Sequence, residues 1–121
     1  MQSKTILVVE DDPFISDLLC TVLMDEGYQT VAAFDGRTAL ELARKIKPDL
    51  ITLDLALPEV NGFHILQSLR DDDSTRHIPI IVLSTYTDRL CRSHRGLADR
   101  IIDKPFDLGE FLQAVGQLGT H

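Results

Sequence analysis

The sequence predicts an α/β fold in which five parallel strands form one sheet with helices on both faces. Five short apolar runs alternate with longer segments whose apolar residues recur at helical spacing. Most of these runs consist of β-branched residues and leucine, as strands buried on both faces do. Such alternation is typical of a parallel sheet with right-handed crossovers. A chain of 121 residues suffices for one domain, expected to span residues 1–121.

The first predicted strand runs from Thr5 to Val9 and leads into a helix. Asp12 and Pro13 mark the helix start, because Asp is a favoured N-cap and Pro suits the first helical position. Gly27 is expected to end this helix. The apolar residues of the helix fall on one stripe: Ile15, Leu18, Leu19, Val22 and Leu23.

A second strand, from Tyr28 to Phe34, has mixed polarity and is expected near an edge of the sheet. Asp35 caps the following helix, and Pro48 ends it. The residues expected to face inward from this helix are Ala39, Leu42, Ala43 and Ile46. The third strand, Leu50 to Asp54, is a short apolar run that stops on a carboxylate.

Residues 57–62 form a loop by their Pro, Asn and Gly content, before a third helix. The apolar residues of that helix are Phe63, Ile65, Leu66 and Leu69. The acids at 71–73 lack the alternating ligand spacing of a calcium loop, so we interpret them as solvated. Pro79 introduces the fourth strand, Ile80 to Ser84.

The last part of the chain contains a weak helix, a short strand and a well-capped helix. Residues 89–96 offer few apolar side chains and predict a poor fourth helix. The fifth strand, residues 101–103, is short. Asp107 and Glu110 form a capping box at the start of the last helix.

Polar residues terminate four of the five apolar runs: Glu10 with Asp11, Asp54, Ser84 and Lys104. The carboxyl ends of parallel strands meet at one edge, where open α/β sheets bind ligands. We therefore expect these side chains to gather around Asp54. Each also has a structural interpretation: the acid pair as helix N-terminal charges, the serine as a strand-end hydroxyl, the lysine as a surface ion-pair partner.

This set of side chains predicts phosphoryl chemistry at a metal site. Three carboxylates close together repel one another and raise at least one pKa unless a cation binds. Mg²⁺ suits such a site, because it takes oxygen ligands and retains several waters. Asp54 could then attack a phosphoryl group and form an acyl phosphate. Lys104 would supply a positive charge for one phosphoryl oxygen, and Ser84 a hydrogen bond for another.

Four segments resemble the receiver domain of bacterial two-component response regulators, in the family's order and spacing: Val8–Asp12, Leu53–Pro58, Asn61–Gly62 and Asp103–Phe106. The resemblance covers essentially the whole chain. It implies a flavodoxin-like sheet of strand order 2-1-3-4-5, which periodicity alone does not give. It also implies a phosphorylation-dependent signalling domain that accepts a phosphoryl group and then switches its binding to a partner.

By this resemblance Asp54 is the phospho-acceptor. Glu10 and Asp11 match the acidic pair that binds Mg²⁺, the implied cofactor, together with Asp54 and the main-chain carbonyl of Ala56. The implied phosphodonor is a histidine kinase or a histidine phosphotransfer protein. The domain would catalyse only its own phosphorylation and dephosphorylation, so we do not expect an enzyme that acts on a separate substrate.

The resemblance also assigns the switch, where the chain departs from the family pattern. Ser84 matches the hydroxyl residue that turns toward the phosphoryl group, and the bond between Lys104 and Pro105 resembles one that is usually cis. The position after the switch hydroxyl, usually Ala or Gly in the family, is Thr85. The position in the fifth strand that usually carries an aromatic switch residue is Ile101. We therefore expect ordinary phosphorylation chemistry and an atypical read-out.

A basic segment precedes the fifth strand, with four arginines against one acid: Arg89, Arg92, Arg95 and Arg100 against Asp99. One interpretation is a solvated helix face. The other is a docking surface for a downstream protein partner on the fourth helix and fifth strand. In that case Arg89, Arg92 and Arg95 would make contacts, while the switch would involve Ser84 and Ile101.

Composition narrows the function classes. The net charge of −7 argues against direct nucleic-acid binding. No apolar run approaches the roughly 20 residues that span a bilayer, so no membrane insertion is expected, and the few residues before the first strand leave no room for a signal peptide. A cytoplasmic monomer or phosphorylation-dependent dimer is expected.

Cys20 and Cys91 lie in no C-x-x-C motif, which disfavours a disulfide or zinc site.

Two rival interpretations stay open. An aspartyl-phosphate phosphatase of the haloacid-dehalogenase type needs a second Asp two residues after its nucleophile, where this chain has Ala56. A receiver-like interaction module with phosphorylation-independent output would usually have lost the Asp, the Lys or the acidic pair. None of these residues is lost here.

Overall fold

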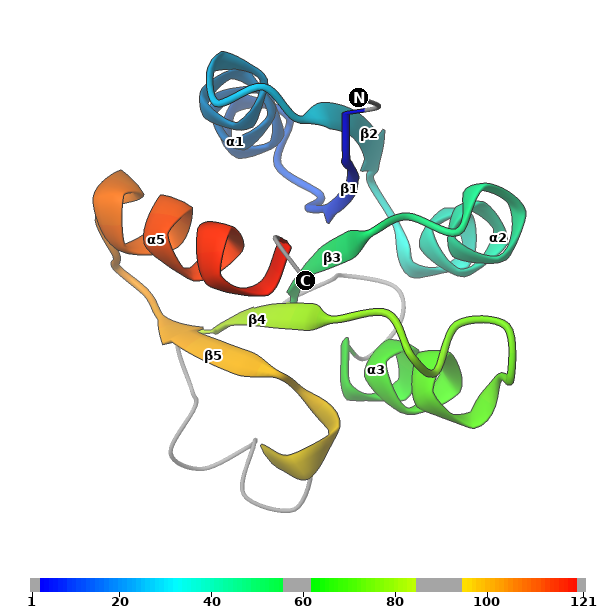
Figure 1. The fold of residues 1–121 in the computed structure, drawn as a ribbon. Coiled ribbons are helices and arrows are strands. Elements are labelled where there is room, and N and C mark those ends of the chain that lie inside the picture. Colours follow the sequence, from blue (N-terminus) through cyan, green and yellow to red (C-terminus); the bar gives the residue numbers. More distant parts are fainter. Residues whose placement is uncertain (1–2, 56–61, 85–94, 120–121) are drawn as a thin grey trace.

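The computed structural model describes residues 3–55, 62–84 and 95–119 (Figure 1). In that part of the chain the elements are β1 (Thr5–Val9), α1 (Pro13–Asp25), β2 (Gln29–Ala33), α2 (Gly36–Ile46), β3 (Leu50–Asp54), α3 (Gly62–Asp71), β4 (Ile80–Ser84), η1 (Arg95–Leu97), β5 (Arg100–Asp103) and α5 (Leu108–Gly119). The expected fourth helix falls outside the described residues, except that its last two positions belong to the 3₁₀ turn η1.

The five strands form one parallel sheet in the order β2-β1-β3-β4-β5, which confirms the predicted α/β fold. The central strand β3 is buried along its whole length, as its uninterrupted apolar run predicts. At the edge, β2 is only partly buried, in agreement with its mixed polarity. Because β3 is central, the residue at its carboxyl end lies between the ends of two neighbouring strands.

Two helical layers cover the sheet, with α1 and α5 on one face and α2 and α3 on the other (Figure 1). Alternate residues of each central strand point into the two layers, so that the sheet separates two apolar clusters. The α2/α3 side includes Leu7, Ile51, Leu53 and Val82, whereas the α1/α5 side includes Val8, Leu50, Ile81 and Phe111. Both faces of the sheet are therefore covered by apolar side chains, as is usual for a parallel sheet.

Helix α1 carries more apolar surface than the core covers. Leu19 and Leu23 are buried in the α1/α5 core. By contrast, Ile15 is 37% and Leu18 48% exposed, and Phe14 in the first turn is 85% exposed. The single stripe predicted from the sequence is thus divided between the core and the solvent. The exposed part forms an apolar patch at the start of α1, which we define as Phe14, Ile15 and Leu18.

The helix ends follow the predicted capping residues. Asp12 accepts hydrogen bonds from the main-chain N–H groups of the first turn of α1, and Asp35 does the same for α2. Asp107 accepts from the N–H of Glu110, 2.6 Å away, which is half of the predicted capping box. Gly27, with φ of +97°, follows α1 in the left-handed region that glycine tolerates best.

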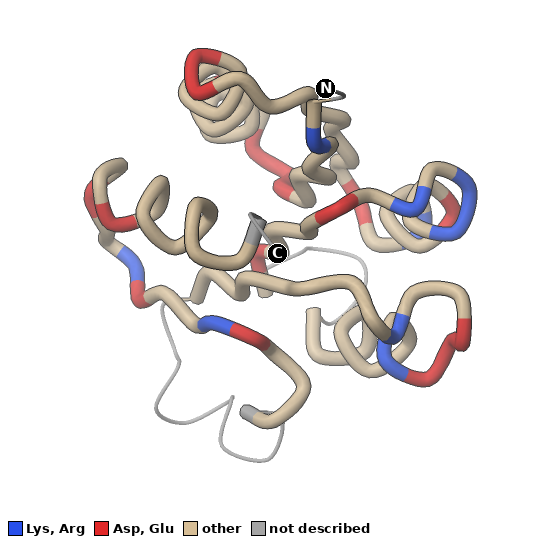
Figure 2. Tube along the Cα trace, in the orientation of Figure 1, with Lys and Arg blue, Asp and Glu red and all other residues tan. Residues whose placement is uncertain are grey.

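Charge is distributed unevenly between the two helical layers (Figure 2). Helices α1 and α5 contain Asp17, Asp25 and Glu110 but no Lys or Arg. Helix α2 contains Arg37, Arg44 and Lys45 against one acid, Glu41, and α3 contains one charge of each sign. Within the described residues, no helix is both long and apolar enough to cross a bilayer.

Gly62 begins α3 against the backbone that follows β3. A Cβ placed on Gly62 would lie 2.5 Å from the Leu55 Cα atom and 2.7 Å from its carbonyl oxygen. The close approach of α3 to Leu55, the residue after Asp54, therefore requires glycine at this position.

We expect Gly62→Ala to lower the free energy of unfolding by about 1–3 kcal/mol, because the added methyl group must displace main-chain atoms. The matched control is Gly116→Ala in α5, where an added Cβ would meet nothing within 4 Å. That variant should gain roughly 0.4–1 kcal/mol, because alanine restricts the unfolded chain. Urea denaturation followed by circular dichroism measures both, and equal effects would contradict the close approach.

Candidate functional site

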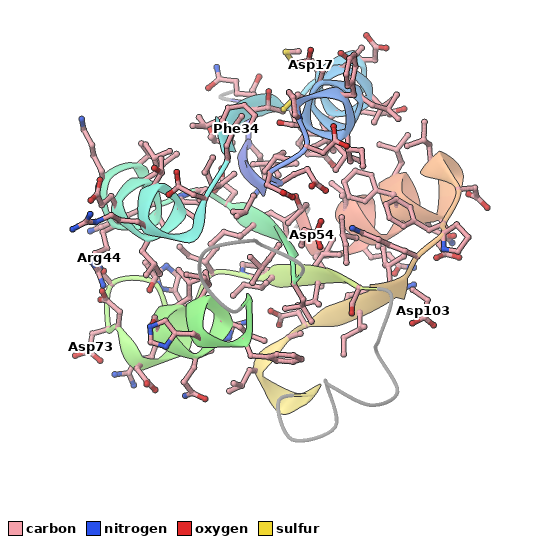
Figure 3. The ribbon with its side chains drawn as sticks, turned by 180° about the vertical axis from the view of Figure 1, so that it is seen from behind. Asp17, Phe34, Arg44, Asp54, Asp73 and Asp103 are labelled. Atoms are coloured by element: carbon pink, nitrogen blue, oxygen red, sulfur yellow. The ribbon has the colours of Figure 1, made fainter. Side chains whose placement is uncertain are left out.

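The register of the sheet brings the predicted residues to one edge. Val9 of β1 pairs with Leu53 of β3, so that Glu10 and Asp54 follow on neighbouring strands. Asp54 lies in the middle of the sheet, between the two helical layers (Figure 3). The Asp54 and Glu10 side chains are buried, with only 3% and 2% of each residue exposed.

Lys104 reaches Asp54 across the end of β4. Its Nζ atom donates to the Asp54 Oδ2 atom at 2.7 Å, while 23% of the lysine side chain remains exposed. The main-chain N–H of Lys104 donates to the Ser84 carbonyl at 2.9 Å, and the Lys104–Pro105 bond is cis. The structure therefore places the predicted ammonium group and the predicted nucleophile in direct contact, through a charge-assisted hydrogen bond.

Three carboxylates form a cluster at the same edge. One oxygen each of Glu10, Asp11 and Asp54 lies within 4.8 Å of the others. Among the described residues this is the one group of three or more acidic, histidine or cysteine side chains arranged to hold a metal ion. The cluster matches the metal-binding acids predicted from the sequence, apart from the carbonyl of Ala56, which lies outside the described residues.

Glu10 has the most perturbed environment of the cluster. Burial, and after it the neighbouring Asp54 and Asp11 carboxylates, together raise the pKa of its carboxyl group to about 8, against the lowering effect of the hydrogen bond from the Asp12 N–H. The Glu10 Oε2 atom accepts that bond at 3.2 Å, whereas Oε1 is buried without a hydrogen-bond partner. A buried oxygen without a donor, beside two other carboxylates, fits a cation.

The oxygen-only donor set suits Mg²⁺. Glu10, Asp11 and Asp54 would hold the ion, and waters would complete its coordination. A bound cation would also favour the ionised form of Glu10 and thereby remove the repulsion within the cluster.

Ser84 ends β4 beside the acidic cluster. It is buried, and it follows Leu83, the residue that pairs with Asp54. Ile101 lies on β5, half-buried against the α2/α3 core, and Arg95 begins η1. Arg89 and Arg92, two of the predicted output residues, lie outside the described residues, as does Thr85.

The acids at 71–73 take no part in the metal cluster. Asp72 accepts hydrogen bonds from the N–H and hydroxyl of Ser74 and pairs with Arg44 at 2.7 Å. The two bonds from Ser74, followed by the one from Arg44, lower the pKa of Asp72 to about 2. Asp73 pairs with Arg76. The prediction that these acids are solvated agrees with the exposed Asp71 and Asp73, but Asp72 is half-buried in local bonds that the sequence did not indicate.

Sequence reasoning also missed the arrangement around Arg70. This arginine binds carbonyls of two segments and the carboxylate of Asp99, at the end of the sheet away from Asp54. The sequence offers only a weak signal for this arrangement: Asp99 is the one acid in a basic segment, and Arg70 lies near the end of a predicted helix.

Comparison with known proteins gives a consistent set of relatives. The family model described as the response regulator receiver domain matches residues 6–116. The "DNA-binding dual master transcriptional regulator RpaA" of Synechocystis is 42% identical over 116 residues, which are 93% of this chain and 48% of RpaA. The "polar-differentiation response regulator DivK" of Brucella anthropi is 34% identical over 114 residues, or 93% of each chain.

A solved structure shows the same fold. The chemotaxis response regulator CheY4 of Vibrio cholerae superposes with a TM-score of 0.88 at 28% sequence identity, covering 97% of this chain and 99% of CheY4. The chain therefore spans about half the length of RpaA, but nearly the whole length of DivK and CheY4.

The raised pKa of Glu10 gives a pH-dependent stability. The folded protein holds the Glu10 proton up to about pH 8, whereas the unfolded chain releases it near the ordinary glutamate pKa of 4.5, so the proton stabilises the fold at low pH. This contribution is complete below the unfolded pKa and is lost as the pH rises through the folded one. Without divalent cations, Glu10→Gln should therefore become progressively more stable than the wild type as the pH rises through this range.

Urea denaturation of both proteins across this pH range measures the difference. Adding Mg²⁺ at the upper end should stabilise the wild type more than the variant, because the ion binds the folded wild type. Parallel pH profiles for the two proteins would contradict the environment described for Glu10.

Proposed function

This chain belongs to the response regulator receiver domain family, and from that membership we propose that Asp54 accepts a phosphoryl group from a phosphohistidine. Receiver domains are the phosphorylation-dependent signalling domains of two-component systems. The observation that carries the assignment to Asp54 is the 2.7 Å contact of its Oδ2 atom with Lys104 Nζ, beside two further acids. The donor in this proposal is a histidine kinase or a histidine phosphotransfer protein.

The transfer exchanges one bond to phosphorus for another. A carboxylate oxygen of Asp54 attacks the phosphorus atom, the bond between phosphorus and the imidazole nitrogen breaks, and its electron pair remains on that nitrogen. Mg²⁺, when bound, neutralises negative charge on the carboxylates and the phosphoryl oxygens. Glu10 and Asp11 hold the ion, with the carbonyl of Ala56 as a further proposed ligand.

Lys104 and Ser84 complete the proposed site. The Lys104 ammonium group already lies against Asp54, so it can follow the charge from the carboxylate to a phosphoryl oxygen without a large movement. The Ser84 hydroxyl can donate to another phosphoryl oxygen from the neighbouring strand. Movement of Ser84 toward the phosphoryl group would link the chemistry to β4 and, through it, to β5 and Ile101.

The proposal limits the chemistry to the domain itself. The chain would catalyse its own phosphorylation and dephosphorylation and would not turn over a separate substrate. Ala56 stands where a phosphatase of the rival class has its acid, which favours the receiver function. A phosphorylation-independent interaction module remains the second candidate, because the output positions Thr85 and Ile101 depart from the family pattern.

The apolar patch on α1 supports a protein donor rather than a small molecule. Phe14, Ile15 and Leu18 are exposed on the helix that begins two residues after Asp11, next to the acidic cluster. Exposed apolar residues grouped beside a reactive site are typical of a protein interface. In our proposal the occupant is the helical segment that carries the donor histidine, so that docking brings the histidine to Asp54.

The proposal assigns output to a separate part of the chain, from residue 89 to the end of β5. A downstream protein partner would bind the surface of the fourth helix and β5, with Arg89, Arg92 and Arg95 as contacts. The domain would act in the cytoplasm as a monomer or as a phosphorylation-dependent dimer. RpaA is named as DNA-binding, but this chain spans about half of RpaA and has a net charge of −7, so we propose no direct nucleic-acid contact.

We expect acetyl phosphate with Mg²⁺ to form a hydroxylamine-labile adduct on Asp54, detected by mass spectrometry. Asp54→Asn should abolish the adduct, because the amide oxygen is a poor nucleophile. Lys104→Ala should slow labelling roughly 100-fold, the usual effect of losing one group that stabilises transition-state charge. Lys45→Ala, an exposed lysine in the last turn of α2, is the matched control and should label at the wild-type rate.

Chelation of Mg²⁺ should also abolish the adduct. An adduct that persists in Asp54→Asn would refute the assignment of the phospho-acceptor. Undiminished labelling in Asp11→Ala would show that the acid pair is only a helix N-terminal charge.

A second prediction separates docking from chemistry. Replacing both Phe14 and Leu18 by alanine should slow transfer from a phosphorylated histidine phosphotransfer protein about tenfold or more, because exposed apolar anchors dominate such interfaces. Labelling by acetyl phosphate, which requires no protein contact, is the reference reaction. Met24→Ala is the control, since Met24 is 53% exposed at the far end of the same helix. An equal loss in both reactions would argue against docking on α1.

A further inference from the structure

Arg70, in the last turn of α3, connects three segments at the end of the sheet away from Asp54. Its Nε atom donates to the Leu97 carbonyl at 2.7 Å, and its Nη1 atom donates to the carbonyls of Arg76 and Ile78, also at 2.7 Å. Its Nη2 atom donates to the Asp99 Oδ2 atom at 2.6 Å. The arginine side chain is only 16% exposed, so these four bonds use most of its donors in a largely enclosed position.

Asp99 continues this network into the sheet. Its Oδ2 atom accepts the main-chain N–H of Ile80 at 2.8 Å, while its own N–H donates to the Ile80 carbonyl at 2.9 Å. The first residue of β4 is therefore bonded in both directions to the residue that precedes β5. Arg70 and Asp99 together form what we call the Arg70–Asp99 clamp.

Strand β5, which follows the clamp, is held by the sheet on one side only. Strand β5 has four residues, lies at the edge of the sheet and pairs only with β4. Of its residues, only Ile102 is fully buried. A shift of one residue would reverse the side of the sheet to which each side chain points. The clamp opposes such a shift at the start of β5, where pairing of Ile81 with Arg100 begins.

Lys104 is the residue that depends on this register. It directly follows β5, and its side chain must cross the end of β4 to place Nζ 2.7 Å from Asp54 Oδ2. The bond from the Lys104 N–H to the Ser84 carbonyl continues the β4–β5 ladder. Any sliding or tilting of β5 therefore moves the ammonium group relative to the nucleophile.

We propose that Arg70 and Asp99 are positioning residues for phosphoryl transfer, which fix the register of β5 and thereby hold Lys104 against Asp54. This inference rests on the proposed function of Asp54. Arginine suits the role because its planar guanidinium group reaches two carbonyl segments and a carboxylate at once, which a single ammonium group does not. The hydrogen bonds of the clamp described above go to Leu97, Arg76, Ile78 and Ile80 and not to the acidic cluster, so we expect its effect to reach the site through Lys104.

The test compares Asp99→Ala, Asp99→Asn and Arg70→Lys with the wild type in labelling by acetyl phosphate, under conditions in which circular dichroism shows each protein to be folded. Asp99→Ala should label about tenfold or more slowly, because small misplacement of a catalytic group has effects of this size. Asp99→Asn keeps an acceptor for the Ile80 N–H and should lose less. Mg²⁺ affinity, measured by calorimetry, should not weaken in any of them, because the acidic cluster is intact.

A double-mutant cycle separates positioning from general destabilisation. In a Lys104→Ala background, Asp99→Ala should cause no further loss of labelling rate, because no ammonium group remains to be positioned. The matched control is Arg44→Ala, which removes the Arg44–Asp72 ion pair between α2 and the segment after α3 without touching β5. That variant should label at the wild-type rate.

Each outcome bears on the inference. Labelling of Asp99→Ala at the wild-type rate, or an equal further loss in the Lys104→Ala background, would overturn it while leaving the proposed function intact. If the wild type itself is not labelled at Asp54, both the proposed function and this inference fail. If Asp99→Ala does not fold, the same comparisons apply to Asp99→Asn and Arg70→Lys.

Discussion

The rest of this structure depends on the burial of acidic side chains at one edge of a parallel sheet. Asp54 and Glu10 are almost completely buried, and burial of ionised groups is costly unless a cation lies nearby. The Lys104 ammonium group offsets part of this cost through its contact with Asp54. The raised pKa of Glu10 shows that the cost of burying a negative charge there is not fully offset. The strand order determines which side chains can meet there, so the fold and the chemistry have the same origin.

Much of the fold and the centre of the site could be predicted from residues along the chain. Apolar runs that stop on Asp54, Glu10 and Ser84 indicate both the strands and their shared edge, because parallel strands end at the same edge of a sheet. Which of these side chains meet depends on the strand order, which only the family resemblance implied. The division of the α1 stripe between core and solvent could not be predicted, since periodicity identifies an apolar face but not how much of it a neighbour covers. Nor could the left-handed Lys47 after α2, where glycine is the usual signal.

The Arg70–Asp99 clamp illustrates a second limit of sequence reasoning. Three of its four hydrogen bonds end on main-chain carbonyls 6 to 27 positions from Arg70, and main-chain groups carry no sequence signature. The two ends of the sheet are thereby distinguished: the carboxyl end holds charged side chains poised for reaction, whereas the amino end holds the bonds that keep strands β4 and β5 in place. Rigid support remote from the reacting atoms is a common means of preserving geometry at a site.

The uneven distribution of charge between the helical layers has a consequence for encounter with other molecules. Within the described helices, the acids of α1 and α5, which have no Lys or Arg beside them, lie across the sheet from the net positive charge of α2, so that these helices produce an electric dipole across the sheet. A partner with a basic surface would be turned toward the α1 side while still about 10 Å away, the screening distance at moderate salt. Orientation would then precede contact, and the rate of productive collisions, more than the lifetime of the complex, would vary with ionic strength.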